Sequence, residues 1–249
     1  MSDTKNLKFS EKSLLTDKFD ISNITPTSFL RGRVVMRDEK GNIFLEKDNM
    51  IVLRGRTFAL EHLFKDPISA SSGYTQDLDR KICLFKIGDG GADVETAPFD
   101  PFVPSYQNLD LSNPVPFITV DPNKNADPIK QANPSIVTEL APGDELIYYD
   151  KVVDGGDPAV FHYYGKVFDT APEWTFNEAG NEVYKKVTLR INTKDARNQY
   201  VNELGLFFAS LDIGGNVYEN IEIFSRICFD TESLTNLTKQ IVIEYFIYA

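Results

Sequence analysis

The feature that most restricts the fold of this chain is the clustering of proline in its middle. Residues 98–142 hold nine of the 13 prolines, namely Pro98, Pro101, Pro104, Pro114, Pro116, Pro122, Pro128, Pro134 and Pro142. Proline fixes φ and lacks the N–H group that a sheet ladder requires, so this stretch is unsuited to a central strand. We therefore expect a long extended segment, called the proline-rich segment (residues 98–142) below, inserted between two blocks of regular structure.

The proline-rich segment also carries large apolar side chains. Phe99, Phe102, Tyr106 and Phe117 recur along it. Long connections without secondary structure of their own are frequently functional, and aromatic residues along them suit draping over a partner or over the protein's own sheet. The sequence leaves both alternatives open, and we predict that these four aromatic residues form an interaction surface.

The flanking blocks have the pattern of short strands. Val34 and Met36 lead into a turn that contains Gly41, and Ile43 and Leu45 lead out of it, which predicts a β-hairpin. Further apolar runs separated by Gly, Asn and Asp predict strands at 82–87, 146–149, 161–168, 183–191, 204–208, 221–229 and 240–248. The run at 240–248 is apolar on both faces, so we expect both of its faces to be covered.

This pattern predicts a mainly β fold, an antiparallel β-sandwich. We expect residues 29–249 to form a single domain with the proline-rich segment as a long insertion. Residues 1–28 are polar with only short apolar pieces, and we predict an extended N-terminal arm there.

One short helix is predicted near residues 57–65, with Thr57 as its N-cap and Pro67 after its end. Apolar residues at i,i+4 spacing define the expected packing face. That face carries Ala59, Leu60, Leu63 and Phe64, and the opposite face carries Glu61, His62 and Lys65.

Composition argues against several classes of partner. The 249 residues have a formal net charge of −11, whereas binding to a phosphate backbone relies on clustered Lys and Arg. The arginines at 31, 33, 54 and 56 form the only basic group, so we expect no nucleic-acid partner. No run of 18 apolar residues exists, so we expect no membrane association. The N-terminal stretch lacks the apolar core of a signal peptide, so we expect the protein to be made in a cytoplasm. Cys83 and Cys228 have no CxxC spacing and are expected to be buried in a reducing compartment.

The glycine-rich stretch Gly88-Asp89-Gly90-Gly91 follows a predicted strand. It lacks the Lys-Ser/Thr pair of a phosphate loop and the helix of a dinucleotide fingerprint. We therefore predict that Gly88, Gly90 and Gly91 are a structural turn, with no cofactor. Calcium at Asp89, Asp93 and Glu95, or at the acidic turn 154–157, stays open as an alternative, although neither matches an EF-hand.

No arrangement typical of an active site is evident. His62 and His162 have no Cys or His neighbour at ligand spacing, and no GxSxG nucleophile elbow occurs. We predict that the chain is not an enzyme. Trp174, together with the tyrosines of Phe161–Gly165, is an alternative candidate for a sugar-binding surface.

Three motifs in a fixed order carry a resemblance. A strand is followed by Gly88, Gly90 and Gly91, then much later come Asn202–Phe207 (NELGLF) and Phe224–Phe229 (FSRICF). In this order they resemble motifs of structural proteins of tailed bacteriophages, in particular tail-collar-fibre-like and other virion proteins. The resemblance covers roughly residues 31–97 and 183–249. The residues matched in the second motif include Asn202, Glu203, Gly205 and Phe207.

The resemblance implies a structural component of a tailed bacteriophage virion, whose partners are copies of itself and other virion proteins. We expect no shaft or receptor-binding region after the domain, and this expectation favours a multimeric tail, neck (collar) or baseplate adaptor over a fibre. A capsid-surface decoration protein or a host-glycan-binding module is the alternative. For Glu203 two interpretations remain: a surface charge beside a strand, or a carboxylate that accepts backbone N–H bonds at a turn.

Overall fold

The structure is a computed structural model, and it describes residues 30–64, 80–92, 101–177, 182–197, 199–212, 217–230 and 240–248. These residues form a 13-stranded sheet and two α-helices. The N-terminal half holds β1 (Arg31–Arg37), β2 (Ile43–Ile51), α1 (Leu53–Phe64), β3 (Lys81–Gly88), β4 (Pro114–Val115), β5 (Ile118–Val120), α2 (Pro128–Ala132) and β6 (Ile136–Val137). The C-terminal half holds β7 (Tyr148–Val153), β8 (Phe161–Val167), β9 (Glu173–Asn177), β10 (Glu182–Ile191), β11 (Glu203–Asp212), β12 (Val217–Cys228) and β13 (Ile241–Tyr248).

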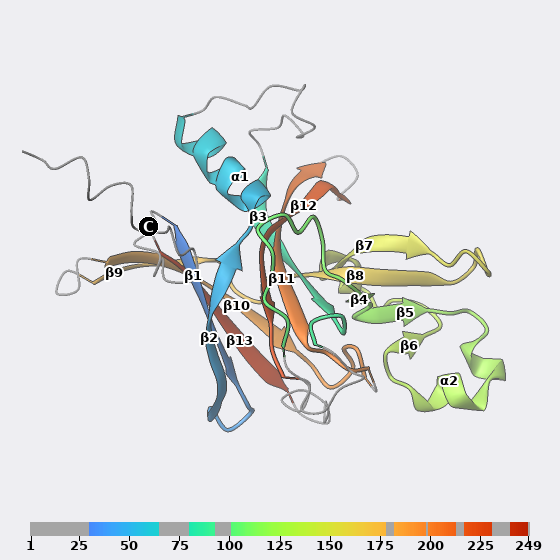
Figure 1. Cartoon of the computed structure of the whole chain (residues 1–249). Coiled ribbons are helices and arrows are strands. Elements are labelled where there is room, and N and C mark those ends of the chain that lie inside the picture. The colour runs from blue at the N-terminus through green and yellow to red at the C-terminus, as the bar shows by residue number, and fades with distance from the viewer. Residues whose placement is uncertain are drawn as a thin grey trace, which may run out of the picture.

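The fold is mainly β, as predicted, and its sheet has two parts. One part runs β2-β1-β13-β10-β9 and the other runs β6-β5-β8-β3-β11-β12, with β4 paired to β3 and β7 paired to β8. Strand β2 belongs to the first part and joins it to β12 of the second part. This connection consists of two residue pairs, Ser225↔Ile51 and Arg226↔Met50. The pairing is antiparallel except between β5 and β6. The sheet is therefore open, with β6 and β9 at its two ends (Figure 1).

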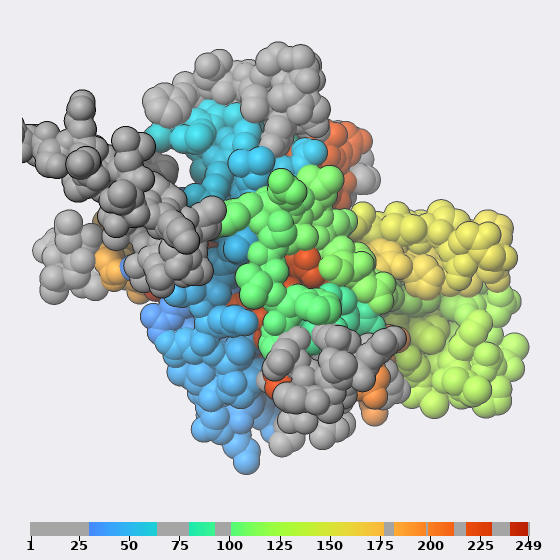
Figure 2. All heavy atoms as spheres, in the orientation of Figure 1, coloured from blue at the N-terminus to red at the C-terminus, as the bar shows by residue number. Residues whose placement is uncertain are grey.

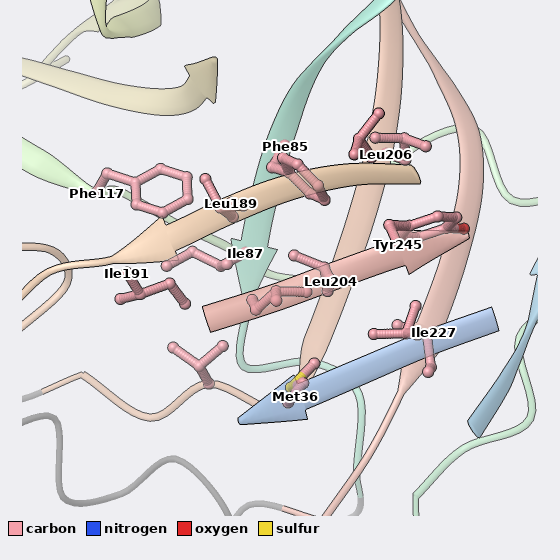
Figure 3. Close-up of a cluster of buried hydrophobic side chains, with 14 of the residues drawn as sticks. Met36, Phe85, Ile87, Phe117, Leu189, Ile191, Leu204, Leu206, Ile227 and Tyr245 are labelled. Carbon is pink, nitrogen blue, oxygen red and sulfur yellow. The ribbon is translucent and has the colours of Figure 1, made fainter. Parts of the chain in front are cut away.

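The hydrophobic core lies between these two parts. Met36 of β1 and Tyr245 of β13 come from one part, and Phe85 of β3 and Leu206 of β11 come from the other (Figure 3). The ring centroids of Phe85 and Tyr245 are 6.3 Å apart in an edge-on arrangement. Burial of large apolar and aromatic side chains from both parts is the main force that holds them face to face. This packing has the layout expected of a β-sandwich.

Strand β13 lies between β1 and β10 and corrects one expectation. Ile241, Ile243 and Tyr245 are buried, whereas Glu244 and Phe246 on the opposite face are only half-buried. Among the described residues this opposite face is only partly covered, and it carries ion pairs, among them Arg37 Nε to Glu244 Oε2 at 2.8 Å. Its apolar residues are shielded by neighbouring aromatic rings on the same surface.

Helix α1 differs from its prediction at the start. It begins at Leu53, four residues before the expected N-cap, and ends at Phe64. Thr57 lies inside the helix, where its Oγ1 donates to the Leu53 carbonyl at 3.0 Å. The predicted start was too late, because Arg54, Gly55 and Arg56 are already helical although one of them is glycine. Gly55 is used for close approach, since a Cβ there would lie 2.1 Å from the Phe224 carbonyl oxygen.

The packing face of α1 is also not the predicted one. Leu60 and Leu63 are 50% and 57% exposed, whereas Phe58 and Glu61 are buried. Phe58 stacks on Phe208 with ring centroids 4.4 Å apart. Glu61 forms a buried ion pair with Arg80, 3.4 Å between Oε2 and Nη2. Arg80 is therefore the buried cation that holds the Glu61 side of the helix inward. The i,i+4 spacing of apolar residues gives no sign of this ion pair.

The proline-rich segment forms no long strand in its described residues, 101–142, although the three-residue β5 pairs with β8 on one side and β6 on the other. These residues contribute the short strands β4, β5 and β6, the five-residue helix α2 and a 3₁₀ turn at Lys124–Ala126. Helix α2 was not predicted, although Asp127 is an N-cap that accepts from Ile129 N at 2.9 Å. Strand β9 was also missed, and β7 begins at Tyr148 because residues Asp144–Leu146 form a 3₁₀ turn. The predicted N-terminal arm, residues 1–28, lies outside the described residues.

Within the described part of the chain, no helix is long and apolar enough to cross a membrane.

Candidate functional site: a buried carboxylate cluster and the groove beside it

The three sequence motifs meet at one place in the structure. Strand β11 lies between β3 and β12, so Glu203 at its start stands opposite Gly88 on one side and Cys228 on the other. Arg226, inside the third motif, is close enough to bind the Glu203 carboxylate. We call Asn202, Glu203, Arg226 and the turn Gly88–Gly91 the Glu203 cluster.

Glu203 is fully buried, and its carboxylate is saturated with donors. Oε1 accepts from the backbone N–H of Asn113 at 2.9 Å and of Gly90 at 3.3 Å. Oε2 accepts from Ser112 N at 3.2 Å and from Arg226 Nε at 2.9 Å. The structure therefore shows the second interpretation of Glu203, a carboxylate that accepts backbone N–H bonds at a turn. Such charge-assisted bonds make burial of the carboxylate tolerable.

The other members of the cluster extend the same network. Arg226 Nη2 also donates to Ser112 Oγ at 2.7 Å. Asn202 Oδ1 accepts from Gly91 N at 2.6 Å, and the Asn202 backbone N–H donates to the Gly88 carbonyl at 2.9 Å. Because Ser112 and Asn113 belong to the proline-rich segment, the cluster ties that segment to the centre of the sheet.

The glycines of the turn permit these close contacts. A Cβ on Gly91 would lie 2.3 Å from the Asn202 carbonyl oxygen, and one on Gly90 would lie 2.6 Å from Ser112 Cβ. Gly205 is restricted in a similar way, since its Cβ would lie 2.5 Å from the buried Phe207 ring. In the structure, then, the matched glycines and Phe207 are packing residues around the cluster.

The four predicted interaction residues fall into different settings. Phe102 and Tyr106 are 50% and 45% exposed. Phe99 lies outside the described residues. Phe117 is fully buried, and the expectation that it contributes to a contact surface was wrong. The chain turns inward after Pro116, where Phe117 N donates to Tyr163 O at 2.9 Å and its ring joins the core.

Phe102 and Tyr106 border a groove of about 520 Å³ between β2 and β12. These strands diverge beyond their two paired residues. The groove is lined by β1, β2, α1, β12 and residues 102–106. Figure 2 shows the proline-rich segment (green) crossing the molecule beside the hairpin β1–β2 (blue). We call this hollow the β2–β12 groove.

Two cations of the β2–β12 groove have no carboxylate partner among the described residues. Lys47 Nζ donates to the Cys228 carbonyl at 3.0 Å. Arg56 donates from Nε to the Ile51 carbonyl at 3.1 Å, and its guanidinium lies 5.2 Å from the Tyr106 ring centroid. The other three arginines of the basic group differ, because each is paired with a carboxylate: Arg31 with Glu182, Arg33 with Glu46 and Arg54 with Glu222.

Asn49, also in the groove lining, has an unsatisfied side chain. Its Nδ2 and Oδ1 are both buried and neither has a hydrogen-bond partner. Leaving a buried polar group unpaired costs about 1–3 kcal/mol. Because both atoms are shielded from solvent, this amide lowers local stability and is not a group that a ligand in the groove can reach. Sequence reasoning missed Asn49 and Lys47, because nothing in their spacing marks them, although Arg56 stood in the basic group.

The histidines occupy structural positions. The ring nitrogens of His62 lie 2.9 Å from the carbonyl oxygens of Phe58 and Arg80, so this ring bridges α1 to the start of β3. His162 Nδ1 lies 3.0 Å from Thr119 Oγ1, and its Nε2 lies 3.5 Å from Asp154 Oδ2.

The predicted sugar-binding combination is not assembled. Trp174 is exposed on β9, at one end of the sheet, whereas Phe161–Gly165 belong to β8 in the other part (Figure 1). Trp174 instead stacks with Phe176, ring centroids 6.4 Å apart, and Lys185 Nζ lies 4.8 Å from its ring.

The acidic turns make local hydrogen bonds. Asp154 Oδ1 accepts from Gly156 N at 2.8 Å, and Asp157 Oδ1 accepts from Ala159 N at 3.0 Å. The Gly156 N–H bond and the neighbouring His162 hold the pKa of Asp154 below its usual value. No three His, Cys, Asp or Glu side chains converge in the described ranges, and Asp93 and Glu95 lie outside them.

Both cysteines are buried free thiols. Burial raises the pKa of Cys83 to about 12 and that of Cys228 above its usual value. Their protonated thiols are poor nucleophiles at neutral pH.

Comparison of the chain with protein-family models, curated proteins and solved structures found no match.

Proposed function

We propose that this protein is a structural component of a tailed bacteriophage virion, a multimeric tail, neck or baseplate adaptor. One observation carries the proposal: the proline-rich segment is fixed to the sheet yet presents a row of exposed apolar residues. Beside Phe102 and Tyr106, Val103 is 86% and Leu109 65% exposed. Leu53 of α1 is exposed next to them, and its N–H donates to the Tyr106 carbonyl at 2.8 Å. Exposed apolar patches of this kind mark protein-binding surfaces.

The Glu203 cluster adds to this argument. It holds the segment through Ser112 and Asn113, so the apolar row stands on a rigid support. A surface that is already ordered loses less conformational entropy when it binds. A structural subunit needs such a surface and needs no active site. The partners proposed are copies of the chain and other virion proteins, without nucleic acid or membrane, and the location proposed is the virion, assembled in the host cytoplasm.

The proposal is tested by two measurements on the intact chain. Light scattering with negative-stain microscopy is expected to show multimers of defined size, and mass spectrometry is expected to find the chain in purified phage particles. A protein that stays monomeric in solution and is missing from particles would refute the proposal.

A second candidate function is a capsid-surface or host-glycan-binding module. The observation in its favour is the exposed stacked pair Trp174–Phe176 with Lys185 beside it. An aromatic face with a cation next to it suits the apolar face and hydroxyl groups of a sugar ring. Glycan-array binding that Trp174→Ala abolishes would support this function. An array without signal for the intact chain would dismiss it.

A further inference from the structure

We propose that the β2–β12 groove receives the tip of the β7–β8 hairpin from a second copy of this chain, so that copies join head to tail. The inference deepens the proposed multimeric role and rests on it. It follows from the cations of the groove that lack a carboxylate partner among the described residues, from its exposed aromatic side chains, and from a protruding acidic turn elsewhere on the same molecule.

The groove suits a partner that is negatively charged and carries apolar side chains. Lys47 and Arg56 face it without a carboxylate partner among the described residues, whereas Arg226 in its lining is neutralised by Glu203. Among the described residues of the lining, Asp48 is the one that is acidic. Phe102 and Tyr106 supply an apolar wall.

The β7–β8 hairpin has the complementary properties. It projects from the body of the molecule, at the right of Figure 1. Val152 and Val153 are exposed near its tip, and the turn that follows contains Asp154, Gly155 and Asp157. The two aspartates hold the turn in shape through bonds to backbone N–H groups. Other groups near their carboxylates are His162, 3.5 Å from Asp154, and Asn123, 3.4 Å from Asp157.

The two surfaces match group by group. The carboxylates of Asp154 and Asp157 would pair with Lys47 and Arg56. Gly155 lies in open space, with no atom within 4 Å of a Cβ built on it, so its backbone can approach closely. The two valines would then lie against the aromatic wall.

The positions of the two surfaces determine the kind of assembly. In Figure 1 the hairpin β1–β2, which borders the groove, lies on the left, and the β7–β8 tip lies on the right. A contact between different surfaces on opposite flanks is heterologous, and repeated copies then form a ring or a filament rather than a two-fold dimer. A ring is the form that an adaptor around a tail or neck requires.

A charge exchange tests the pairing in the full-length chain. The groove variant carries Lys47→Glu and Arg56→Glu, and the tip variant carries Asp154→Lys and Asp157→Lys. Each variant alone is expected to associate at least about ten-fold more weakly than the original chain, because it places like charges together. Light scattering over a concentration series measures this change, and circular dichroism verifies that each variant is folded.

Restoration is the decisive measurement. An equimolar mixture of the two variants pairs each reversed groove with a reversed tip, so multimers should return, and a single chain with all four substitutions should also assemble. Lys40→Glu with Lys81→Glu makes the same charge change as the groove variant at exposed sites outside the groove and should assemble normally. Asp154→Asn with Asp157→Asn preserves the turn and removes only charge, so it should still weaken association.

The outcomes separate this inference from the proposed function. The hairpin contact would be overturned if the groove and tip variants each assemble as the original chain does. It would also be overturned if both variants are folded and their mixture stays unassembled. The role in the virion would stand in that case if the chain multimerises and is found in particles. An original chain that is monomeric and absent from particles would instead refute the role itself.

Discussion

Glu203 shows how one residue connects a motif to the position of a long segment. The free energy of burying its carboxylate is offset by Arg226 and by three backbone N–H donors. Removal of one member of a buried ion pair typically costs 3–5 kcal/mol, because the remaining charge is left without compensation. The structural role of the residue therefore depends on its charge.

We predict that Glu203→Gln lowers the free energy of unfolding by about 3–5 kcal/mol, because Arg226 stays buried without its counter-charge. Urea denaturation monitored by tryptophan fluorescence and circular dichroism measures the change. Glu46→Gln is the matched control, since the Glu46–Arg33 pair is exposed and should contribute at most about 1 kcal/mol. Equal effects of the two substitutions would contradict the role given to the cluster.

Gly91→Ala is expected to destabilise the fold by about 1–3 kcal/mol, because the new methyl group would overlap the Asn202 carbonyl oxygen. Gly155→Ala serves as the control, since its Cβ meets nothing within 4 Å, and its effect should stay within about 0.5 kcal/mol. Thermal unfolding of both variants measures the difference. A Gly91 variant as stable as the original chain would mean that the turn can move aside.

At the scale of single residues, the sequence predicted the structure where the residue types themselves restrict the local conformation. Glycines after a strand predicted a turn, and Glu203 could be narrowed to two interpretations. The partners of Glu203 could not be found, because Ser112, Asn113 and Arg226 are brought to it only by the strand order. Asn49 is invisible in the sequence for a related reason: its amide is unusual only in what surrounds it.

At the scale of elements, helix α1 is the most informative case. Its apolar residues at i,i+4 spacing predicted one packing face, and the structure buries another. Phe58 packs on Phe208, and Glu61 is held inward by Arg80. Periodicity measures only apolar content, so it misses a face that is chosen by a buried ion pair.

The orientation of α1 leads to a direct test. Leu60→Lys should change the free energy of unfolding by no more than about 0.5 kcal/mol, because Leu60 is exposed. Phe58→Ala should lower it by about 3–5 kcal/mol through loss of a buried ring. Chemical denaturation compares the two variants, and the reverse order of effects would support the face predicted from the sequence.

Strands were predicted best where apolar residues recur over a long run, alternating with polar ones in β10 and nearly continuous in β13. The short strands β4, β5, β6 and β9 have too few residues to show a period, and they form because a neighbouring strand offers a free edge. The two-sided apolar pattern of β13 predicted two covered faces, whereas ring contacts within one surface shield its outer side.

A buried thiol on β3 and a half-buried phenol on β12 predict a loss of stability in alkali. Burial raises the pKa of Cys83 to about 12. Burial is also the main reason why the pKa of Tyr218 is raised to about 12. As pH rises above about 9, the unfolded chain loses these protons first and binds fewer protons than the folded chain, so the free energy of unfolding falls. Cys83 alone should contribute a loss of about 2 kcal/mol between pH 9 and 11.

Urea denaturation at the two pH values measures this loss. Cys83→Ala should be less stable at both pH values but should show a smaller decrease between them. A decrease unchanged by the substitution would mean that Cys83 ionises in the folded protein as readily as in the unfolded chain.

At the scale of the whole molecule, two exposed aromatic surfaces compete as binding sites. Phe102 and Tyr106 stand on the proline-rich segment, whereas Trp174 and Phe176 stand on the end strand β9. Phe102→Ala with Tyr106→Ala should reduce association at least about ten-fold while changing stability little, because exposed aromatic anchors contribute mainly to binding. Light scattering measures the association.

Trp174→Ala with Phe176→Ala is the matched control, since it also removes two exposed rings and should leave association unchanged. If the second pair weakens assembly and the first does not, the contact surface lies at β9.

The arrangement of the whole sheet could be predicted only as a class. Composition and strand pattern indicated a mainly β protein with an inserted extended segment, and both are present in the structure. The strand order depends on pairings between distant residues, such as β1 with β13, and no local pattern encodes them. The β2–β12 groove depends on the same long-range pairings, because it forms where β2 separates from β12 after two paired residues.

The position of β13 has a consequence for how the protein is made. Arg37 and Glu244 bind each other across 207 positions of sequence, and β13 separates β1 from β10. While the ribosome is still adding residues 241–248, the β1–β2 hairpin and β10 have already emerged, each with an unsatisfied edge. Contacts of such long range make folding slow, and open edges attract other nascent chains. Synthesis and release of β13 from the ribosome is therefore the step that closes both edges and lowers the risk of aggregation.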